Sequence, residues 1–302
     1  MHKMLQQVFG SNFKPFAPKC YYAHYGSPAS VLVFEDLKTE GFRLADRNLG
    51  LEMQHTLLCV RTLATYHAAS VVLYKKGEDN FEPFNCGVYG KNNTKDLETM
   101  FVPVLRDLAV EVGTWPGYER FSGKLHEIAD NCTKMMLDGV TRDDNEFNVL
   151  AHEDAWINNL MYRYSEDTGE VVDLRLVDFQ TCQWISPAID LQRYLLSSAS
   201  AEVVQQYEFV LEEYLKVLRD TLKALGHEHL CPTIDHLKQQ MKKRAMFGLI
   251  LGIIVRSVIL ADSEDFPDVD KIMRNEGKVK FSKLFLEVIR KQLPVLEKND
   301  WI

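Results

Sequence analysis

Three oxygen-bearing side chains in the middle of this sequence have the spacing that a hairpin would bring together. Asp154 precedes Asn159 by five residues, and Asp178 follows an apolar run nineteen residues after Asn159. Residues 160–164 and 171–177 are typical of strands, joined by six turn-forming residues. In an antiparallel pair the start of one strand lies beside the end of the other, ~4.7–4.9 Å away. We therefore expect all three side chains at one end of a hairpin.

These side chains suit a particular chemistry. Carboxylate and amide oxygens are hard ligands of the kind Mg²⁺ prefers when it also binds nucleotide phosphates. In kinases one Asp orients the attacking hydroxyl, while an Asn and a second Asp hold the metal. Each residue alone is an ordinary turn residue, but HEDAWINN, two strands and VDFQ in this order indicate phosphoryl transfer. A metal-dependent phosphoesterase is a weaker alternative, since few further acids or histidines stand near a strand end.

The surrounding elements predict an α+β fold. Residues 21–37 read as a hairpin with its turn at Gly26 to Pro28, and residues 77–95 as a surface loop. Apolar residues recur at helical spacing elsewhere, and Gly226 is a plausible helix end. The predicted helices cover residues 50–76, 97–108, 123–137, 203–225, 234–261 and 281–296. A small sheet should thus precede a mainly helical body that is interrupted by the hairpin of Asn159 and Asp178.

Composition narrows the functional classes. The chain has 302 residues, 46% of them hydrophobic, and a net charge of −8, so no basic field exists to hold nucleic acid. The six dispersed cysteines suggest reduced thiols, and the polar N-terminus predicts a cytoplasmic protein. Residues 246–261 are apolar but short of the ~20 needed to span a bilayer, so we expect a buried helix and no membrane span. Nothing in the pattern indicates an oligomeric state.

Five segments together resemble a known family. They are FAPKCYYA at 16–23, VFEDLKTEGFRLADR at 33–47, LATYHAAS at 63–70, HEDAWINNLMYRY at 152–164 and LRLVDFQTCQWISPAIDL at 174–191. The sequence resembles the ecdysteroid kinase-like family of insects, relatives of choline kinase and aminoglycoside phosphotransferases with the protein-kinase-like fold. The resemblance implies ATP and Mg²⁺ as cofactors and a small-molecule alcohol as acceptor, such as an ecdysteroid or another hydroxylated lipophile.

The resemblance also implies residue roles. Asp154 would be the catalytic base, and Asn159 and Asp178 would ligate Mg²⁺. VFEDL would be the hinge between lobes, where backbone groups from Glu35 to Leu37 receive adenine. His152 would support the catalytic loop.

Two further residues are expected to support the structure. Asp190 would cap a helix and brace the catalytic loop. His67, on the face of its helix that carries Ala64 and Val71, is expected to be a core histidine with satisfied hydrogen bonds.

Two departures from the family pattern bear on activity. Glu153 stands where relatives more often have Gly, so it either alters the charge around Asp154 or simply faces solvent. The Gly-rich loop and the strand Lys that clamp phosphates in kinases are not found, and Lys3, Lys14 and Lys19 lie in the wrong contexts. MHKMLQQVF resembles the end of the helix that would carry the clamp's glutamate.

The resemblance divides the chain in two: residues 1–37 would be the remnant of a truncated N-terminal β lobe with the hinge, and residues 38–302 the helical C-terminal lobe. Because the phosphate clamp is not found, two functions stay open. The chain is either a kinase or a catalytically inactive pseudokinase that binds a nucleotide or partner. Trp156 and Trp184 either line an apolar substrate pocket or pack in the core.

Overall fold

A computed structural model describes residues 1–27, 29–46, 50–77, 80–89, 94–261 and 278–302. The seven strands form three small antiparallel sheets within the described residues. They are β1 (Cys20–His24), β2 (Val31–Phe34), β3 (Phe42–Leu44), β4 (Val149–Ala151), β5 (Leu160–Tyr164), β6 (Val171–Leu176) and β7 (Gln183–Ile185). Sheet order is β1-β2, β3-β5-β6 and β4-β7. The α+β class is therefore confirmed.

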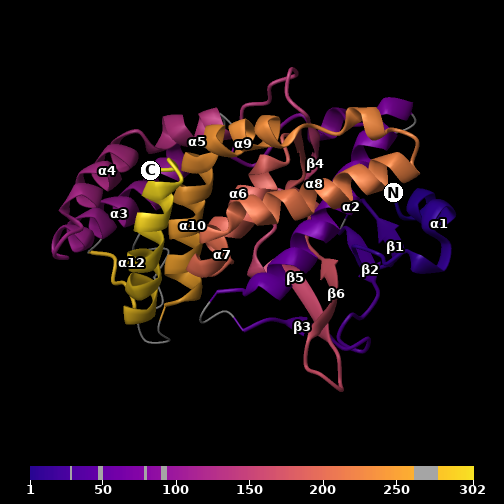
Figure 1. The fold of residues 1–302 in the computed structure, drawn as a ribbon, viewed down its shortest axis with the longest axis horizontal. Coiled ribbons are helices and arrows are strands. Elements are labelled where there is room, and N and C mark those ends of the chain that lie inside the picture. Colours follow the sequence, from indigo (N-terminus) through magenta and orange to yellow (C-terminus); the bar gives the residue numbers. More distant parts are fainter. Residues whose placement is uncertain (28, 47–49, 78–79, 90–93, 262–277) are drawn as a thin grey trace.

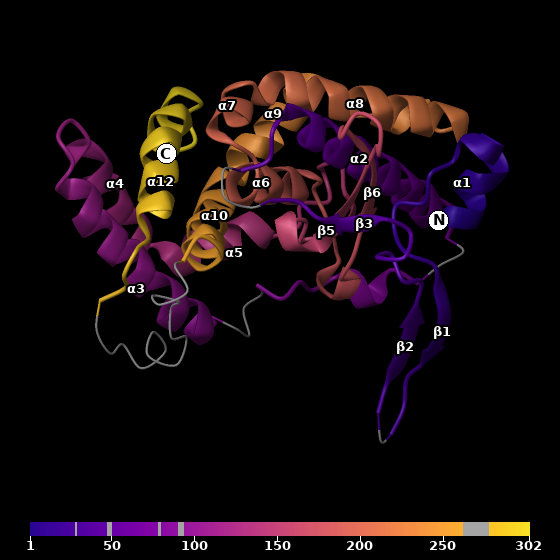
Figure 2. The ribbon, with the colours of Figure 1, turned by 90° about the horizontal axis from the view of Figure 1, so that it is seen from below.

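The β1–β2 hairpin extends away from the helical body (Figure 2). Ala23 pairs with Leu32 and Tyr22 with Val33, so these two pairs lie on opposite faces of the hairpin. All nine strand residues are exposed. The predicted hairpin is confirmed, although Pro28 of the predicted turn lies outside the described residues.

The helices make up most of the body (Figure 1). They are α1 (His2–Phe9), α2 (Met53–Lys76), α3 (Thr94–Gly113), α4 (Glu119–Asp130), α5 (Cys132–Val140), α6 (Ala188–Ser197), α7 (Ala201–Gln205), α8 (Tyr207–Ala224), α9 (Ile234–Lys243), α10 (Ala245–Ile259) and α12 (Lys283–Lys298). The predicted loop at 77–95 falls partly outside the described residues. The six cysteines carry free thiols, as expected.

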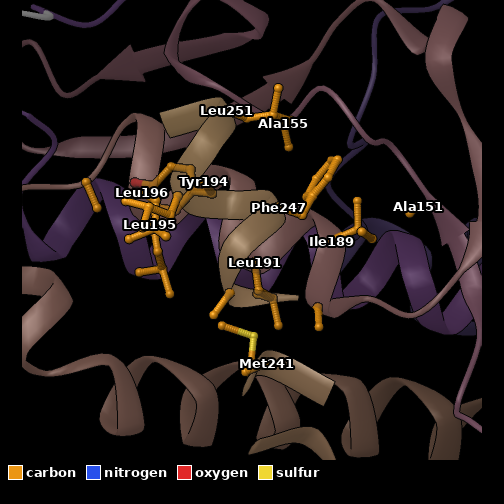
Figure 3. Close-up of a cluster of buried hydrophobic side chains, with 14 of the residues drawn as sticks. Ala151, Ala155, Ile189, Leu191, Tyr194, Leu195, Leu196, Met241, Phe247 and Leu251 are labelled. Carbon is orange, nitrogen blue, oxygen red and sulfur yellow. The ribbon is translucent and has the colours of Figure 1, made fainter. Parts of the chain in front are cut away.

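One hydrophobic core joins the loop of residues 152–156 to helices α6 and α10. Figure 3 shows Ala151, which precedes this loop, and Ala155, which lies within it, in one cluster of buried side chains with Leu191 of α6 and Phe247 of α10. All four side chains are fully buried. Burial of such side chains contributes ~1.5–3 kcal/mol for each large one. The loop therefore starts and ends at fixed points of the core.

Three predicted helices are each divided in two. The helix predicted at 123–137 breaks at Asn131, whose backbone N–H (3.1 Å) and side-chain Nδ2 (2.9 Å) both donate to the carbonyl oxygen of Glu127. The helix predicted at 234–261 breaks at Arg244, whose buried guanidinium pairs with Glu146. The segment 203–225 likewise forms α7 and α8, and Gly226 follows with φ +81°.

Within the described residues, α2 alone is long and apolar enough to cross a membrane by length and composition. Two-thirds of its most apolar stretch is buried inside the protein, against α8 and strands β4 and β6. Core helices of this kind pass the same test. Residues 245–259 form the buried helix α10, as predicted.

Candidate active site

The loop of residues 152–156, which carries Asp154, leaves β4 and leads through a short 3₁₀ turn, Ile157–Asn159, into β5. Strand β4 pairs with β7, while β5 pairs with β6 with Leu160 opposite Leu176. The Val177 N–H also donates to the Asn159 carbonyl oxygen (3.1 Å), which extends the hairpin by one bond. Asn159 and Asp178 therefore lie at the same end of the hairpin, as the spacing predicts.

Asp154 is held by two side chains. Asn159 Nδ2 donates to Asp154 Oδ2 (2.8 Å) and to its carbonyl oxygen (3.0 Å). Arg193 Nη2 donates to Asp154 Oδ1 (2.6 Å) from α6. Each carboxylate oxygen has two acceptor sites, so each keeps one for a further donor such as a substrate hydroxyl. Arg193 was missed by sequence reasoning, since only the packing of α6 brings it to the loop.

Asp190 braces the loop from below. Its Oδ2 accepts the His152 N–H (2.7 Å) and its Oδ1 the Glu153 N–H (2.7 Å). His67 Nε2 lies 2.9 Å from the same Oδ2, and His67 Nδ1 lies 2.9 Å from the Tyr214 hydroxyl. These contacts are the ones that the predicted bracing role of Asp190 requires, and His67 is a core histidine with satisfied hydrogen bonds, as expected. The capping role is wrong, because Asp190 is the third residue of α6 and makes no cap hydrogen bond.

His152 connects Asp190 to the segment that carries Asp178. Its Nε2 lies 3.0 Å from the carbonyl oxygen of Val177, the residue before Asp178. Burial lowers the pKa of His152, so the neutral ring donates Nε2–H to that carbonyl. Burial acts to raise the pKa of Asp190, but the hydrogen bond and charge of His67, together with His152 and its backbone N–H, outweigh it and lower that pKa. Asp190 is therefore a buried carboxylate that holds the loop of Asp154 directly and the Val177–Asp178 segment through His152.

Asp178 and the predicted hinge face one cavity of about 830 Å³. Asp178 is exposed and adopts a left-handed backbone conformation with φ +68°, which Asp tolerates better than most residues. The cavity is lined on one side by the β1–β2 hairpin and the segment Glu35–Lys38, and on the other by Met161 of β5 and residues 177–180. Glu35, Leu37 and Asp178 are thus brought together, as the hinge prediction requires.

Two backbone groups of the predicted hinge have no hydrogen-bond partner in the described chain. The Glu35 N–H donates to Lys19 O (2.9 Å), and the Glu35 side chain accepts the Lys19 N–H (3.1 Å). Among the hydrogen bonds of the described chain, none uses the Glu35 carbonyl oxygen or the Leu37 N–H. Adenine offers an amino donor next to a ring acceptor, which is the complement of this pair.

Asn159 and Asp178 fit a divalent cation that is also bound by phosphate. Because Asn159 directs its amide donors at Asp154, its Oδ1 is the atom that remains for a metal. The described residues contain no cluster of three His, Cys, Asp or Glu side chains that would hold a metal unaided. Mg²⁺ is usually bound by one or two protein side chains together with nucleotide oxygens, so a site of Asn159 and Asp178 suits it. The described residues do not support a two-metal phosphoesterase site.

The open questions on three neighbours are now answered. Glu153 is fully buried, so the alternative in which it faces solvent is wrong. Trp184 stacks on Tyr74 (ring centroids 4.1 Å apart) in the core. Trp156 is half-buried and packs against the same core. Neither tryptophan lines the cavity at Asp178.

A helical body, an antiparallel hairpin and acids beside a hinge-lined cavity define a kinase-like protein. The model of the ecdysteroid kinase-like family matches residues 1–227. The chain belongs to this family, as its motifs predict. A comparison with curated proteins finds no match.

Proposed function

We propose that the chain transfers the γ-phosphoryl group of ATP to the hydroxyl of a small-molecule alcohol. Family membership supports kinase-type phosphotransfer to a small molecule. The observation that carries the finer proposal is the fixed Asp154, which keeps acceptor sites while Asn159 and Arg193 hold it. Ecdysteroids or other hydroxylated lipophiles are the proposed acceptors, in the cytoplasm.

The proposed roles follow from the contacts. The acceptor hydroxyl oxygen attacks the γ-phosphorus, the bond to the ADP oxygen breaks, and the hydroxyl proton passes to the Asp154 carboxylate. Asn159 and Asp178 would hold Mg²⁺, which supplies charge neutralisation at the phosphates. The free backbone groups at Glu35 and Leu37 would bind adenine in the cavity. The main protein contribution is then positioning, through the brace of Asp190.

Isosteric variants test this proposal. Asp154→Asn should lower Mg²⁺-dependent ATP turnover on hydroxylated steroids by ~10²–10⁴-fold, because the proton acceptor is lost. Asp178→Asn should lower turnover as well, and added Mg²⁺ should restore part of it. Asp167→Asn is the matched control, since it changes an exposed acid in the turn of the same hairpin. Equal turnover in all four proteins contradicts the proposal.

A nucleotide-binding pseudokinase is the second candidate. The observation in its favour is that α1 carries no acidic residue to pair with a phosphate-clamping lysine. Under this alternative ATP stabilises the chain against heat, Asp154→Asn leaves that stabilisation unchanged, and no acceptor is phosphorylated. Phosphoryl transfer to any alcohol that depends on Asp154 excludes it.

A further inference from the structure

Glu153 is a carboxyl group sealed inside the protein directly before Asp154. Its side chain has no exposed surface, and neither carboxyl oxygen has a hydrogen-bond partner. Its backbone has φ +64°, which is uncommon for a residue with a side chain. The bond from its N–H to Asp190 helps to keep this conformation. Its side-chain oxygens require an explanation of their own.

A second unpartnered oxygen faces the same place. Gln183 of β7 donates Nε2–H to the Val140 carbonyl oxygen (3.4 Å), while its Oε1 is buried without a partner. A Cβ atom on Gly87 would lie 2.4 Å from Gln183 Oε1 and 2.7 and 2.8 Å from the two Glu153 oxygens. Three oxygens thus converge on the space that Gly87 leaves open. Any larger residue at position 87 would displace them.

Three acceptors with no donor do not form a stable buried cluster. An ionised carboxylate without a partner costs several kcal/mol when it is removed from water. A carboxylic acid has an O–H donor, and one proton on Glu153 supplies the donor that the cluster lacks. Protonation is therefore the simplest way to satisfy Glu153 and Gln183 together.

The surroundings of Glu153 favour its protonated form. Burial is the main effect and raises the pKa of Glu153 to about 8. Asp190 of α6 and Asp154 of the same loop raise it further, while Arg193 of α6 acts in the opposite direction. The other titratable neighbours are the Tyr89 hydroxyl and the Cys182 thiol, and burial raises the pKa of both, so neither brings a charge at neutral pH.

We propose that Glu153 is a positioning residue that acts as a neutral acid. It donates its O–H to Gln183 Oε1 and so ties the loop of Asp154 to strand β7. Loss of the proton removes this donor and places a second negative charge beside Asp154. The consequence for catalysis rests on the proposed kinase function, whereas the hydrogen bond itself does not.

Unfolding as a function of pH tests the proton directly. Because the pKa is raised in the folded protein, the stabilisation by the proton is complete below the ordinary pKa and disappears as pH rises through about 8. Glu153→Gln keeps the shape and an N–H donor but does not titrate. Relative to wild type, its urea midpoint should therefore rise steadily from pH 5 to pH 8 and then stay constant.

Glu212→Gln, which changes an exposed acid on α8, should retain the pH dependence of wild type. Infrared spectra of wild type at pH 7 should also show the carbonyl band of a protonated carboxylic acid, which Glu153→Gln removes. This measurement needs no stable variant. A wild-type pH dependence in Glu153→Gln, or no such band at pH 7, overturns the inference.

Turnover separates a positioning role from a purely structural one. As pH rises above 8, kcat of wild type should fall at least tenfold, with the KM for ATP unchanged, while kcat of Glu153→Gln should stay level. An alkaline fall in kcat that is identical in both proteins overturns the positioning role. If neither protein turns over ATP, the proposed kinase function fails, and the unfolding and infrared results still decide the state of Glu153.

Discussion

At the residue scale, the charge of Asp190 is the feature on which the loop geometry depends most. One fully buried carboxylate accepts bonds from two consecutive backbone N–H groups and from His67. These donors lie on α2 and on the loop of residues 152–156, while Asp190 lies on α6. A single side chain therefore contacts the loop and both helices at once.

Asp190→Asn should destabilise the protein by about 3 kcal/mol at pH 7, since hydrogen bonds to a charged acceptor contribute ~1.5–3 kcal/mol each. Urea unfolding measures this loss. The pKa of Asp190 is lowered in the folded state, so its contribution is present above the ordinary pKa and is lost as pH falls through the folded value. The difference between variant and wild type should therefore shrink below pH 4.

Asp220→Asn provides the control, because this exposed residue on α8 has none of these contacts. It should unfold like wild type at both pH values. An Asp190→Asn variant whose deficit is as large at pH 3 as at pH 7 would show that the charge of Asp190 is not what matters.

The same scale shows what sequence can and cannot predict. Asp154, Asn159 and Asp178 were predictable because a hairpin turns linear spacing into proximity. Asp190 was predictable as a brace from family likeness. Arg193 and the burial of Glu153 were not, because both depend on how α6 and β7 pack against the loop, and no local pattern records that packing.

At the element scale, the close approach of α10 to α6 fixes the helix that carries Asp190 and Arg193. A Cβ atom on Gly252 of α10 would lie 2.6 Å from the Leu196 carbonyl oxygen, and one on Gly248 would lie 2.8 Å from Gln192 Cβ. Arg256, further along α10, donates to the Leu196 and Ala199 carbonyl oxygens at the end of α6. Helix α10 therefore contacts α6 through glycines and caps its end.

Gly252→Ala should destabilise the protein by ~1–3 kcal/mol, because a backbone carbonyl cannot move aside as a side chain would. Gly123→Ala is the matched control, since nothing lies within 4 Å of a Cβ at this position of α4. Alanine forms helix better than glycine by ~0.8–1.0 kcal/mol, so the control should raise stability. Thermal unfolding of both variants measures the contrast. Two variants that shift stability in the same direction would contradict the close approach.

Two helices predicted as continuous are each interrupted, one at Asn131 and one at Arg244. Apolar periodicity identified most of the helical segments, because burial of one face dominates their pattern, but α1 and α6 lie outside the predicted ranges. It did not reveal the breaks at Asn131 and Arg244. The first coincides with a side-chain bond from Asn131 to the Glu127 carbonyl oxygen, and the second with a buried ion pair from Arg244 to Glu146, 98 residues away.

At the scale of the whole molecule, the β1–β2 hairpin separates two kinds of exposed surface. Leu32 and Phe34 line the cavity that also contains Asp178, whereas Tyr22 and Val33 do not. Leu32 is 47% exposed and Val33 45% exposed, so burial does not distinguish them. Strand pairing distinguishes Leu32 from Val33, since adjacent residues of a strand point to opposite faces of the hairpin.

Leu32→Thr should therefore weaken nucleotide binding, and Val33→Thr should not. Loss of apolar contact with a bound base on the cavity face costs ~1–2 kcal/mol, or roughly five- to thirtyfold in Kd. Val33→Thr instead removes apolar surface from the outer face, where exposed apolar side chains on a two-stranded sheet with open edges favour association between chains. Titration calorimetry with Mg²⁺ and ATP measures the first effect, and light scattering over a concentration series measures the second. If the two variants exchange these effects, the cavity lies on the other face of the hairpin.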